Sequence, residues 1–356
     1  MRNIVQLVQH LRPGGLENMV LNLKSASENG DRMWIISLEG DKGELLRRWP
    51  ELKPYKHRIL ALNKAPGFDA GVVVELARWL LRLKAYTLHS HHIGPFIYGC
   101  LCQMLLFKGH QITHLHTVHD AWHIQGIKSR LIYRWMKSLC GVKLVADAHF
   151  VAEAFSSATQ MTALTVVNNG IDTQKFTPGD AAEARRGLGL PQQVCLLGCG
   201  ARMVKGKGQH YLIEALAQLP AHYHLALAGS GPEEIELKVQ SVALGLCDRV
   251  HFLGQISDMV SFYQSLDVFC LVSAREGLPL AVLESIACGV PVVSTPVGAI
   301  PEVVNASNGR LLSALSANAV VNAVIELQRE GVHQAVSLPE SYSLGHMTAQ
   351  YDKLLA

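Results

Sequence analysis

Short apolar runs rich in Val, Ile and Leu alternate along the chain with segments whose apolar residues recur every three or four positions. The short runs are typical of buried strands, and the longer spacing is typical of helices. In the first half the predicted strands are Ile4–Val8, Met33–Ser37, Arg58–Leu62, Thr87–His89, Ile112–Thr117, Lys143–Ala146 and Leu164–Val167. In the second half they are Val194–Gly198, Tyr223–Ala228, Val250–Leu253, Val268–Val272, Pro291–Ser294 and Arg310–Leu312. This alternation predicts parallel β-α-β units in an α/β protein.

A cluster of turn formers separates the two halves. It runs from Asn168-Asn-Gly-Ile-Asp172 to Phe176-Thr-Pro-Gly179, and Asn, Gly, Asp and Pro together mark a loop. With 356 residues the chain is long enough for two domains of ordinary size. We therefore predict two domains joined by this segment.

Composition narrows the class of protein. Hydrophobic residues make up 49% and charged residues 17% of the chain, as in a well-packed globular protein. The first residues do not show the pattern of a secretory signal peptide, and no apolar run approaches the roughly 18–20 residues of a membrane span. None of the eight cysteines forms a C-x-x-C pair, which argues against a disulfide framework or a zinc knuckle. A cytoplasmic protein, soluble or peripheral on a membrane, is expected.

The net charge of +3 is modest, but the basic residues are clustered. Nine Lys or Arg residues and a single acid, Asp120, lie between positions 78 and 143. Within this stretch residues 128–137 predict a basic amphipathic helix that carries Tyr133 and Trp135. Such a helix fits an anionic membrane surface, and it fits equally a solvated helix whose apolar side packs on the sheet. No nucleic-acid-binding motif accompanies the cluster.

Two carboxylates stand eight positions apart in Arg275-Glu276-Gly-Leu-Pro-Leu-Ala-Val-Leu-Glu284. The segment follows a predicted strand, so Glu276 is expected in the loop at its carboxyl end. Glu284 is expected inside the next helix, Pro279–Cys288. Open α/β sheets bind ligands at this edge, and a helix N-terminus suits an anion such as a diphosphate.

Basic side chains follow another predicted strand of the second half, in Gly198-Cys-Gly-Ala-Arg202-Met-Val-Lys205-Gly-Lys207-Gly208. Arg offers a planar fork and Lys a point charge for phosphate oxygens. The glycines do not complete a dinucleotide fingerprint, because Met203 stands where the third glycine is required.

In the first half, the loop Arg12-Pro-Gly14-Gly15-Leu-Glu17 follows the first strand, and its glycines allow a ligand close to the backbone. A second feature is a group of eight histidines between positions 89 and 123. His114 and His116 alternate on one strand, so we weigh a shared metal against polar lining and hydrogen-bonded fold residues. The members are His89, His91, His92, His110, His114, His116, His119 and His123.

Taken in order, these segments resemble the retaining nucleotide-sugar glycosyltransferases of family four, which have the GT-B fold. The family carries E-x7-E where this chain has Glu276 and Glu284, and R-x4-K where it has Arg202 and Lys207. It also has a G-G-x-E loop matching Gly14 and Gly15, and a histidine matching His119. The segment Arg249–Gly254, which carries Phe252, resembles the family strand that meets the nucleotide base.

The resemblance implies two Rossmann-like domains facing across a deep cleft, with a C-terminal helix returning to the first domain. We expect residues 1–172 with 342–356 to form the acceptor-side domain, and residues 173–341 the nucleotide-sugar-binding domain. The donor sugar would lie against Glu276 and His119, the ribose on Glu284, and the diphosphate between Arg202 and Lys207. Backbone N–H groups of Gly277, Leu278 and Leu280 would contact the β-phosphate or sugar hydroxyls. Pro279 stands where many relatives have glycine, so that position donates no hydrogen bond.

The implied reaction is metal-independent transfer of a sugar from a nucleotide-diphosphate donor to a hydroxyl acceptor, with the anomeric configuration retained. The donor is a co-substrate, and no cofactor is expected. The expected acceptor is a saccharide or a lipid-linked saccharide of bacterial surface polysaccharide or lipopolysaccharide, made at the inner face of the cell membrane. Nucleotide-sugar epimerisation and a non-catalytic binding role are the alternatives.

Overall fold

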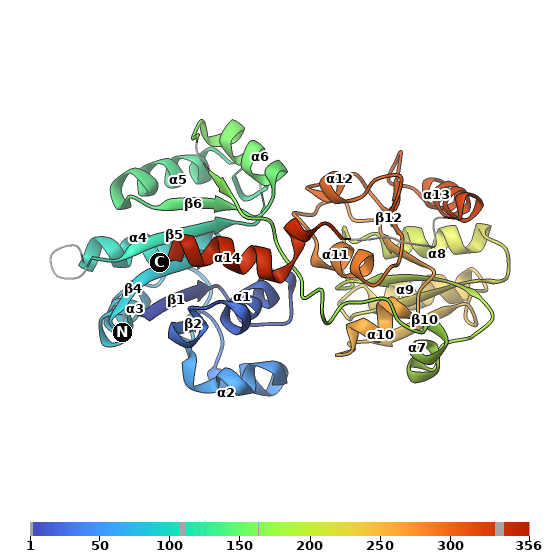
Figure 1. Cartoon of the computed structure of the whole chain (residues 1–356), viewed down its shortest axis with the longest axis horizontal. Coiled ribbons are helices and arrows are strands. Elements are labelled where there is room, and N and C mark those ends of the chain that lie inside the picture. The colour runs from blue at the N-terminus through green and yellow to red at the C-terminus, as the bar shows by residue number, and fades with distance from the viewer. Residues whose placement is uncertain are drawn as a thin grey trace. The chain divides into compact units, whose positions relative to one another are not determined.

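The computed structural model describes residues 3–106, 111–120, 122–124, 126–162, 164–331 and 338–355. Its internal contacts divide the chain into two compact units (Figure 1). The first unit comprises residues 1–170 and 344–356, and the second comprises residues 171–343.

The first unit is built on a seven-stranded parallel sheet in the order β3-β2-β1-β4-β5-β6-β7. The strands are β1 (Asn3–Val8), β2 (Met33–Ser37), β3 (Ile59–Ala61), β4 (Ala85–His91), β5 (Thr113–Val118), β6 (Lys143–Ala146) and β7 (Thr165–Val166). The helices between them are α1 (Gly15–Ala26), α2 (Lys42–Arg48), α3 (Ala70–Arg82), α4 (Ile93–Leu106), α5 (Ile127–Cys140) and α6 (His149–Thr159). Three 3₁₀ segments accompany them, η1 (Gly30–Arg32), η2 (Pro50–Arg58) and η3 (Trp122–Ile124). Because the strands are parallel, β1, β4 and β5 end at one edge of the sheet.

The last helix, α14 (Leu344–Leu355), belongs to the first unit. Met347, Tyr351 and Leu355 are buried in one apolar cluster with Ile4 of β1 and Leu115 of β5. The helix packs beside α1. The Tyr351 hydroxyl and Thr117 Oγ1 are 3.0 Å apart. The expected return of the C-terminal helix to the first unit is therefore confirmed.

The second unit carries a six-stranded parallel sheet in the order β10-β9-β8-β11-β12-β13. Its strands are β8 (Cys195–Gly200), β9 (Tyr223–Ala228), β10 (Val250–Gly254), β11 (Val268–Leu271), β12 (Val292–Ser294) and β13 (Gly309–Leu311). Its helices are α7 (Ala181–Leu188), α8 (Gln209–Gln218), α9 (Glu234–Ala243), α10 (Met259–Gln264), α11 (Leu280–Ala287), α12 (Ile300–Val303) and α13 (Ala317–Glu330), followed by the 3₁₀ segment η4 (Glu340–Tyr342). A separate apolar core, centred on Leu197, Leu225 and Val268, holds this unit together.

Each strand that the apolar runs predict is present, and the sheets are parallel as expected. The largest difference is β4, which extends two residues further at each end than the predicted Thr87–His89. Ser90 and His91 therefore belong to the strand, although the predicted strand ended at His89. Within the described ranges, every helix is too short or too polar to cross a membrane.

Candidate active site

Most second-unit residues that the sequence singles out lie in loops at the carboxyl edge of its sheet. Arg202 and Lys207 follow β8, and Glu276 follows β11, its direct neighbour in the sheet. The two loops are joined by a hydrogen bond in which the Ala274 N–H donates to the Gly206 carbonyl at 2.7 Å. Gly208 has a φ of +72°, and a Cβ there would run into the Val272 carbonyl oxygen. Only glycine fits this crossing without strain.

This crossing brings Lys207 and Glu276 together. The Lys207 Nζ donates to Glu276 Oε1 at 2.6 Å, and the side chains are 26% and 9% exposed. Arg202 is exposed, and its guanidinium has no hydrogen-bond or ion-pair partner among the residues described. The loop thus presents one paired and one unpaired cation beside a carboxylate, an arrangement that can receive an anionic ligand.

The second carboxylate, Glu284, is positioned from inside helix α11. Its Oε2 accepts a hydrogen bond from the Tyr263 hydroxyl at 2.7 Å, and Tyr263 is fully buried. Burial raises the pKa of Glu284, while the Tyr263 hydrogen bond and the charge of Lys175 oppose that rise. A buried carboxylate with one fixed donor retains a second oxygen that can accept hydrogen bonds from a ligand.

The loop before α11 packs against the segment that contains Gly298 and Ala299. The Ala299 N–H donates to the Gly277 carbonyl at 2.9 Å, and Gly298, with a φ of +61°, lies against the backbone of Glu276 and Gly277. The Leu278 and Leu280 side chains are buried. Their side chains therefore serve the core, and at these two positions only the backbone can meet a ligand. Leu280 opens α11, so its N–H lies at the positive end of the helix dipole.

Phe252 lies inside β10, two residues before the strand ends at Gly254. Its ring packs against the core of the second unit, and the Lys238 ammonium lies 5.3 Å from the ring centroid. The Gly229 N–H donates to the Gly254 carbonyl at 2.7 Å, which joins the end of β10 to the loop after β9. Phe252 thus lies two residues before the carboxyl end of β10, in the same parallel sheet whose β8 and β11 lead to Arg202 and Glu276.

In the first unit, Gly14 and Gly15 follow β1 at the start of α1. Gly14 is the N-cap residue and Gly15 the first residue of the helix. The Glu17 carboxylate turns back toward Gly14, where it would meet an added Cβ, and lies 3.1 Å from His10 Nδ1. The missing side chain of Gly14 therefore leaves room for the buried Glu17 carboxylate.

His119 follows β5 at the same edge of the first sheet. Its Nε2 lies 3.0 Å from His91 Nδ1, and its Nδ1 lies 3.1 Å from Asp147 Oδ2. Its side chain is 9% exposed. Both ring nitrogens of His119, which the family resemblance places against the donor sugar, are therefore engaged within the unit.

The other described strand histidines are hydrogen-bonded fold residues. His89 pairs with Thr117, and the Ser90 hydroxyl lies within 2.9 Å of both His114 and His116. Burial lowers the pKa of all of these rings, that of His114 to about 3. Across the described part of the chain, no group of three His, Cys, Asp or Glu side chains is arranged to hold a metal ion. His110 and the His123 side chain lie outside what the structure describes.

Two family profiles match the chain, one after the other. The profile "Glycosyltransferase Family 4" covers residues 13–175, and the profile "Glycosyl transferases group 1" covers residues 180–337. The chain belongs to the group 1 glycosyltransferases of family four.

Curated relatives of this family match part of the chain. It is 36% identical over 171 residues to the lipopolysaccharide core biosynthesis mannosyltransferase LpsB of Rhizobium meliloti, covering 45% of this chain and 49% of that protein. It is 30% identical over 182 residues to a GDP-mannose-dependent phosphatidylinositol monomannoside mannosyltransferase of Corynebacterium glutamicum, covering 47% of each. The matches thus span about half the length of these relatives.

Solved structures of glycosyltransferases match over the full chain. Anabaena HepE in complex with UDP and glucose has a TM-score of 0.83 at 21% identity, covering 100% of this chain and 99% of that one. Sucrose-phosphate synthase of Thermosynechococcus elongatus has a TM-score of 0.76 at 19% identity, covering 99% and 95%. At these identities the likeness concerns the fold, which is GT-B, with two Rossmann-like parallel-sheet domains.

The structure adds residues that the family motifs do not include. Asp147 lies after β6, where no pattern distinguishes it from a loop residue, yet it contacts His119. Tyr263 reads as one more apolar position of α10, yet its hydroxyl binds Glu284. His92 has a φ of +66°, and its ring centroid lies 6.2 Å from that of His119. Left-handed backbone at a non-glycine residue is strained and is enriched at functional sites.

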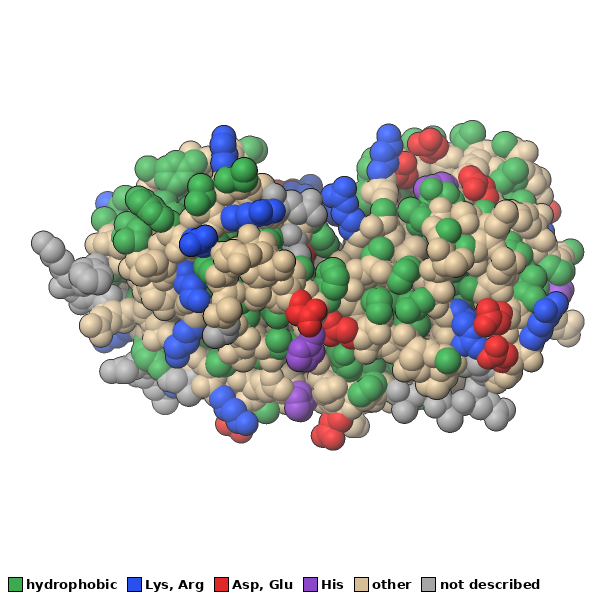
Figure 2. All heavy atoms as spheres, turned by 90° about the horizontal axis from the view of Figure 1, so that it is seen from above, with side chains coloured by type: hydrophobic (Ala, Val, Ile, Leu, Met, Phe, Trp, Pro, Cys, Tyr) green, Lys and Arg blue, Asp and Glu red, His purple; other side chains and the backbone are tan. Residues whose placement is uncertain are grey.

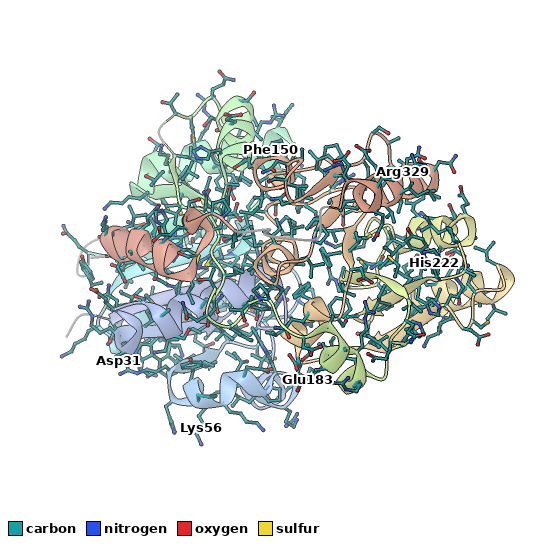
Figure 3. All side chains as sticks on the ribbon, turned by 45° about the vertical axis from the view of Figure 1, so that its right-hand side comes forward. Asp31, Lys56, Phe150, Glu183, His222 and Arg329 are labelled. Carbon is teal, nitrogen blue, oxygen red and sulfur yellow. The ribbon has the colours of Figure 1, made fainter. Side chains whose placement is uncertain are left out.

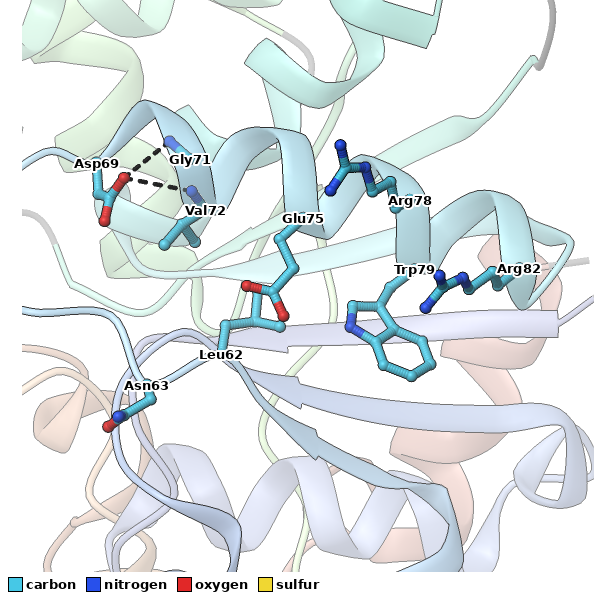
Figure 4. Close-up of a pocket in the computed structure, with 9 residues that line it drawn as sticks. All are labelled: Leu62, Asn63, Asp69, Gly71, Val72, Glu75, Arg78, Trp79 and Arg82. Atoms are coloured by element: carbon cyan, nitrogen blue, oxygen red, sulfur yellow. Dashed lines mark hydrogen bonds between the residues drawn. The ribbon is translucent and has the colours of Figure 1, made fainter.

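Two surface hollows lie away from these residues. One, of about 530 Å³, runs along α3 and is lined by Glu75, Arg78 and Trp79, with the Asp69 cap at its end (Figure 4). The other, of about 420 Å³, lies where β8 and β11 begin and includes the exposed His222 (Figure 3). Both are open and shallow, and neither contains a side chain that the family motifs assign.

Proposed function

We propose that this protein transfers a sugar from a nucleotide-diphosphate donor to a hydroxyl acceptor with retention of anomeric configuration. The observation that carries the proposal is the Lys207–Glu276 ion pair beside the exposed Arg202, at the carboxyl edge of a parallel sheet. A leaving diphosphate gains negative charge as the glycosidic bond breaks, so its site needs fixed positive charge. This edge offers two cations at the loop where such a ligand binds in α/β proteins.

In the proposed complex Lys207 gives up part of its contact with Glu276 to bind a phosphate oxygen, and Arg202 binds a second one. The N-terminus of α11 contributes the N–H groups of Gly277, Leu278 and Leu280. Glu276 then holds the sugar, and Glu284, oriented by Tyr263, accepts from the ribose hydroxyls. Phe252 would lie near the nucleotide base, and Gly14, Gly15 and His119 would serve the first unit's side of the reaction.

The proposed chemistry proceeds on one face of the sugar. The bond from the anomeric carbon to the diphosphate oxygen breaks, and the acceptor oxygen bonds to the same face. The acceptor proton passes to the departing phosphate, so no enzyme nucleophile is required. The cationic side chains and helix dipole take the role that a divalent metal has in other glycosyltransferases, and metal independence is part of the proposal.

The names of the relatives support an acceptor in cell-surface glycan assembly. LpsB of Rhizobium meliloti and LpcC of Rhizobium leguminosarum are both lipopolysaccharide core mannosyltransferases, and the second is 33% identical over 170 residues. We propose a saccharide or lipid-linked saccharide acceptor of lipopolysaccharide or surface polysaccharide. The first unit would serve the acceptor, and the second the nucleotide sugar.

Helix α5 supports a membrane-bound acceptor. Ile127, Leu131, Trp135 and Leu139 are each more than half exposed, and their i, i+4 spacing forms one stripe of the helix. Figure 2 looks onto the face that carries α5 and α6 and shows hydrophobic and basic side chains next to one another on the first unit. The sequence left open whether the apolar side of this helix packs on the sheet. Tyr133 is buried against Phe96, whereas these four residues are exposed. An apolar stripe flanked by Lys128 and Arg134 has the chemistry of an anionic lipid surface at the inner face of the cell membrane.

Membrane binding can be tested by co-sedimentation with vesicles of phosphatidylcholine containing about a third phosphatidylglycerol. We expect binding at low salt, loss of binding in Trp135→Glu, and unchanged binding in Val239→Glu. Val239 is a matched control, because it is an exposed apolar residue on α9 of the second unit. Equal sedimentation of the wild type with and without vesicles would instead indicate a soluble acceptor.

The reaction itself can be tested in two steps. The protein's melting temperature is measured with each member of a panel of UDP-, GDP- and ADP-sugars. The true donor should raise it, since a ligand that binds only the folded state stabilises that state. Transfer to an acceptor extract, followed by NMR of the anomeric proton, then reports the configuration. EDTA should leave the rate unchanged. Free nucleotide and a changed sugar without any acceptor would favour an epimerase, and binding without turnover would favour a non-catalytic role.

A further inference from the structure

A chain of hydrogen bonds crosses the carboxyl ends of the central strands of the first unit. Gln6 Oε1 lies 2.9 Å from His91 Nε2, and His91 Nδ1 lies 3.0 Å from His119 Nε2. His119 Nδ1 lies 3.1 Å from Asp147 Oδ2, which also accepts from Asn169 Nδ2 at 3.0 Å. Each member donates or accepts at a fixed atom. The donor and acceptor roles at one end of this hydrogen-bond chain therefore determine which atom carries the proton at each following contact.

The orientation of the Gln6 side-chain amide sets which atom donates at each contact of this hydrogen-bond chain. Its Nε2 faces the Met33 sulfur at 3.8 Å, and a thioether only accepts hydrogen bonds. The amide oxygen therefore faces His91, and the proton of that contact must reside on His91 Nε2. Burial lowers the pKa of His91 well below its usual value, so the ring is neutral and carries one proton. His91 Nδ1 is then an acceptor, and His119 Nε2 must donate to it.

This leaves His119 Nδ1 facing a carboxylate. A neutral His119 with its proton on Nε2 would set a lone pair against Asp147 Oδ2, which is repulsive at 3.1 Å. We propose that His119 and Asp147 hold one additional proton between Nδ1 and Oδ2, forming a pair of zero net charge whose direction Gln6 sets through His91. Asp147 is thus a positioning residue for His119.

The surroundings agree with an uncharged pair. Burial raises the pKa of Asp147, and Asp120 adds to that rise, which favours retention of the proton. Asp147 Oδ1 is buried and has no hydrogen-bond partner in the described residues. The other titratable groups around the pair are His89, His91 and His92 at β4, His116 on β5, Asp120 after β5, and Tyr351 on α14.

The consequence for catalysis rests on the proposed function. Where His119 meets an anionic donor, a pair without net charge does not repel it. A neutral His119 beside an ionised Asp147 would place a buried negative charge there instead. Raising the pH removes the shared proton. The hydrogen bonds from Gln6 to Asp147 can then reverse their donor–acceptor direction only if the Gln6 side-chain amide flips, so that its Nε2 faces His91.

The test is the protonation state of His119 in the ligand-free, full-length protein. Long-range ¹H–¹⁵N spectra of ¹⁵N-histidine-labelled protein report each ring nitrogen, and His119→Gln identifies the His119 signals. We expect a protonated Nε2 at neutral pH, with an Nδ1 signal that changes when alkaline pH removes the shared proton. In Asp147→Asn the Nε2 proton should persist, with a bare Nδ1 that no longer responds to pH. A bare Nε2 in the wild type at neutral pH would overturn the proposal.

Kinetics provide a second, separate readout. Asp147→Asn leaves the pair uncharged at every pH, so it should remove the alkaline limb of the pH profile of kcat/KM for the donor and change kcat little at neutral pH. An unchanged profile would overturn the positioning role. Because the spectra need neither donor nor acceptor, they can support the proton assignment even if no sugar transfer is found. Transfer together with a bare Nε2 would instead reject the pair and leave the proposed function intact.

Discussion

Replacement of Lys207 by Ala tests the role of the ion pair at the carboxyl edge of the second sheet. The change removes the ammonium that lies 2.6 Å from Glu276 Oε1 and leaves a carboxylate that is only 9% exposed without its cation. Two effects follow, a loss of stability from the unpaired carboxylate and a loss of transition-state stabilisation if Lys207 binds the diphosphate. The two effects can be separated, because the loss of stability comes from the contact of the ammonium with Glu276 and the loss of kcat from its proposed contact with the diphosphate.

The magnitudes follow from burial and distance. A unit charge about 4 Å from an ammonium is worth about 4 kcal/mol at an effective dielectric constant of about 20. Loss of one such catalytic contact typically lowers kcat about 10²- to 10³-fold. Because Lys207 is 26% exposed, we expect the lower end, about 100-fold. The cost in stability should lie between that of exposed pairs, under about 1 kcal/mol, and that of buried pairs, about 3–5 kcal/mol.

The assay is nucleoside-diphosphate release at saturating donor and acceptor, with thermal unfolding measured on the same samples. Lys205→Ala is the matched control, because Lys205 is an exposed lysine of the same loop. The double variant Lys207→Ala/Glu276→Gln removes the unpaired charge and should recover most of the lost stability without recovering kcat. A Lys207→Ala protein that keeps more than about a third of wild-type kcat would refute the diphosphate assignment.

Three further outcomes are expected. Glu284→Gln should weaken donor binding yet raise the melting temperature at neutral pH. Because burial raises the pKa of Glu284 in the folded state, the wild type loses stability as pH rises from the unfolded value of 4.5 through the raised one. An equal difference in melting temperature at pH 4 and pH 7 would contradict this. Gly208→Ala should cost about 1–3 kcal/mol and weaken donor binding, whereas Gly187→Ala, in open space within α7, should not destabilise. Residues 171–343 expressed alone should fold and retain donor binding, as they have their own core, and calorimetry without heat on donor addition would reject a self-sufficient donor site.

The local pattern of the chain was enough to predict its strands. Buried parallel strands are nearly continuous apolar runs, so segments such as Ile4–Val8 and Tyr223–Ala228 are visible without any tertiary information. The pattern was less informative where polar residues are buried. Ser90 and His91 lie within β4, where Ser90 contacts His114 and His116 of β5 and His91 contacts Gln6 of β1, although the sequence pattern had ended the predicted strand at His89.

Candidate site residues were visible where chemistry depends on residue type and short spacing. Glu276 and Glu284 share one strand-to-helix turn, and Arg202 and Lys207 share one loop, so each pair could be found from the sequence. That Lys207 contacts Glu276, 69 positions away, follows from β8 and β11 being neighbours in the sheet, which spacing along the chain does not report.

The sequence by itself determined the fold class and the residue types available at each strand end, because periodicity and turn chemistry are local. Only the tertiary structure decided which of those residues meet, since hydrogen bonds depend on strand order and not on separation. His119 shows the difference. Its place after β5 is readable from the chain, but its partners His91 and Asp147 come from the strands on either side.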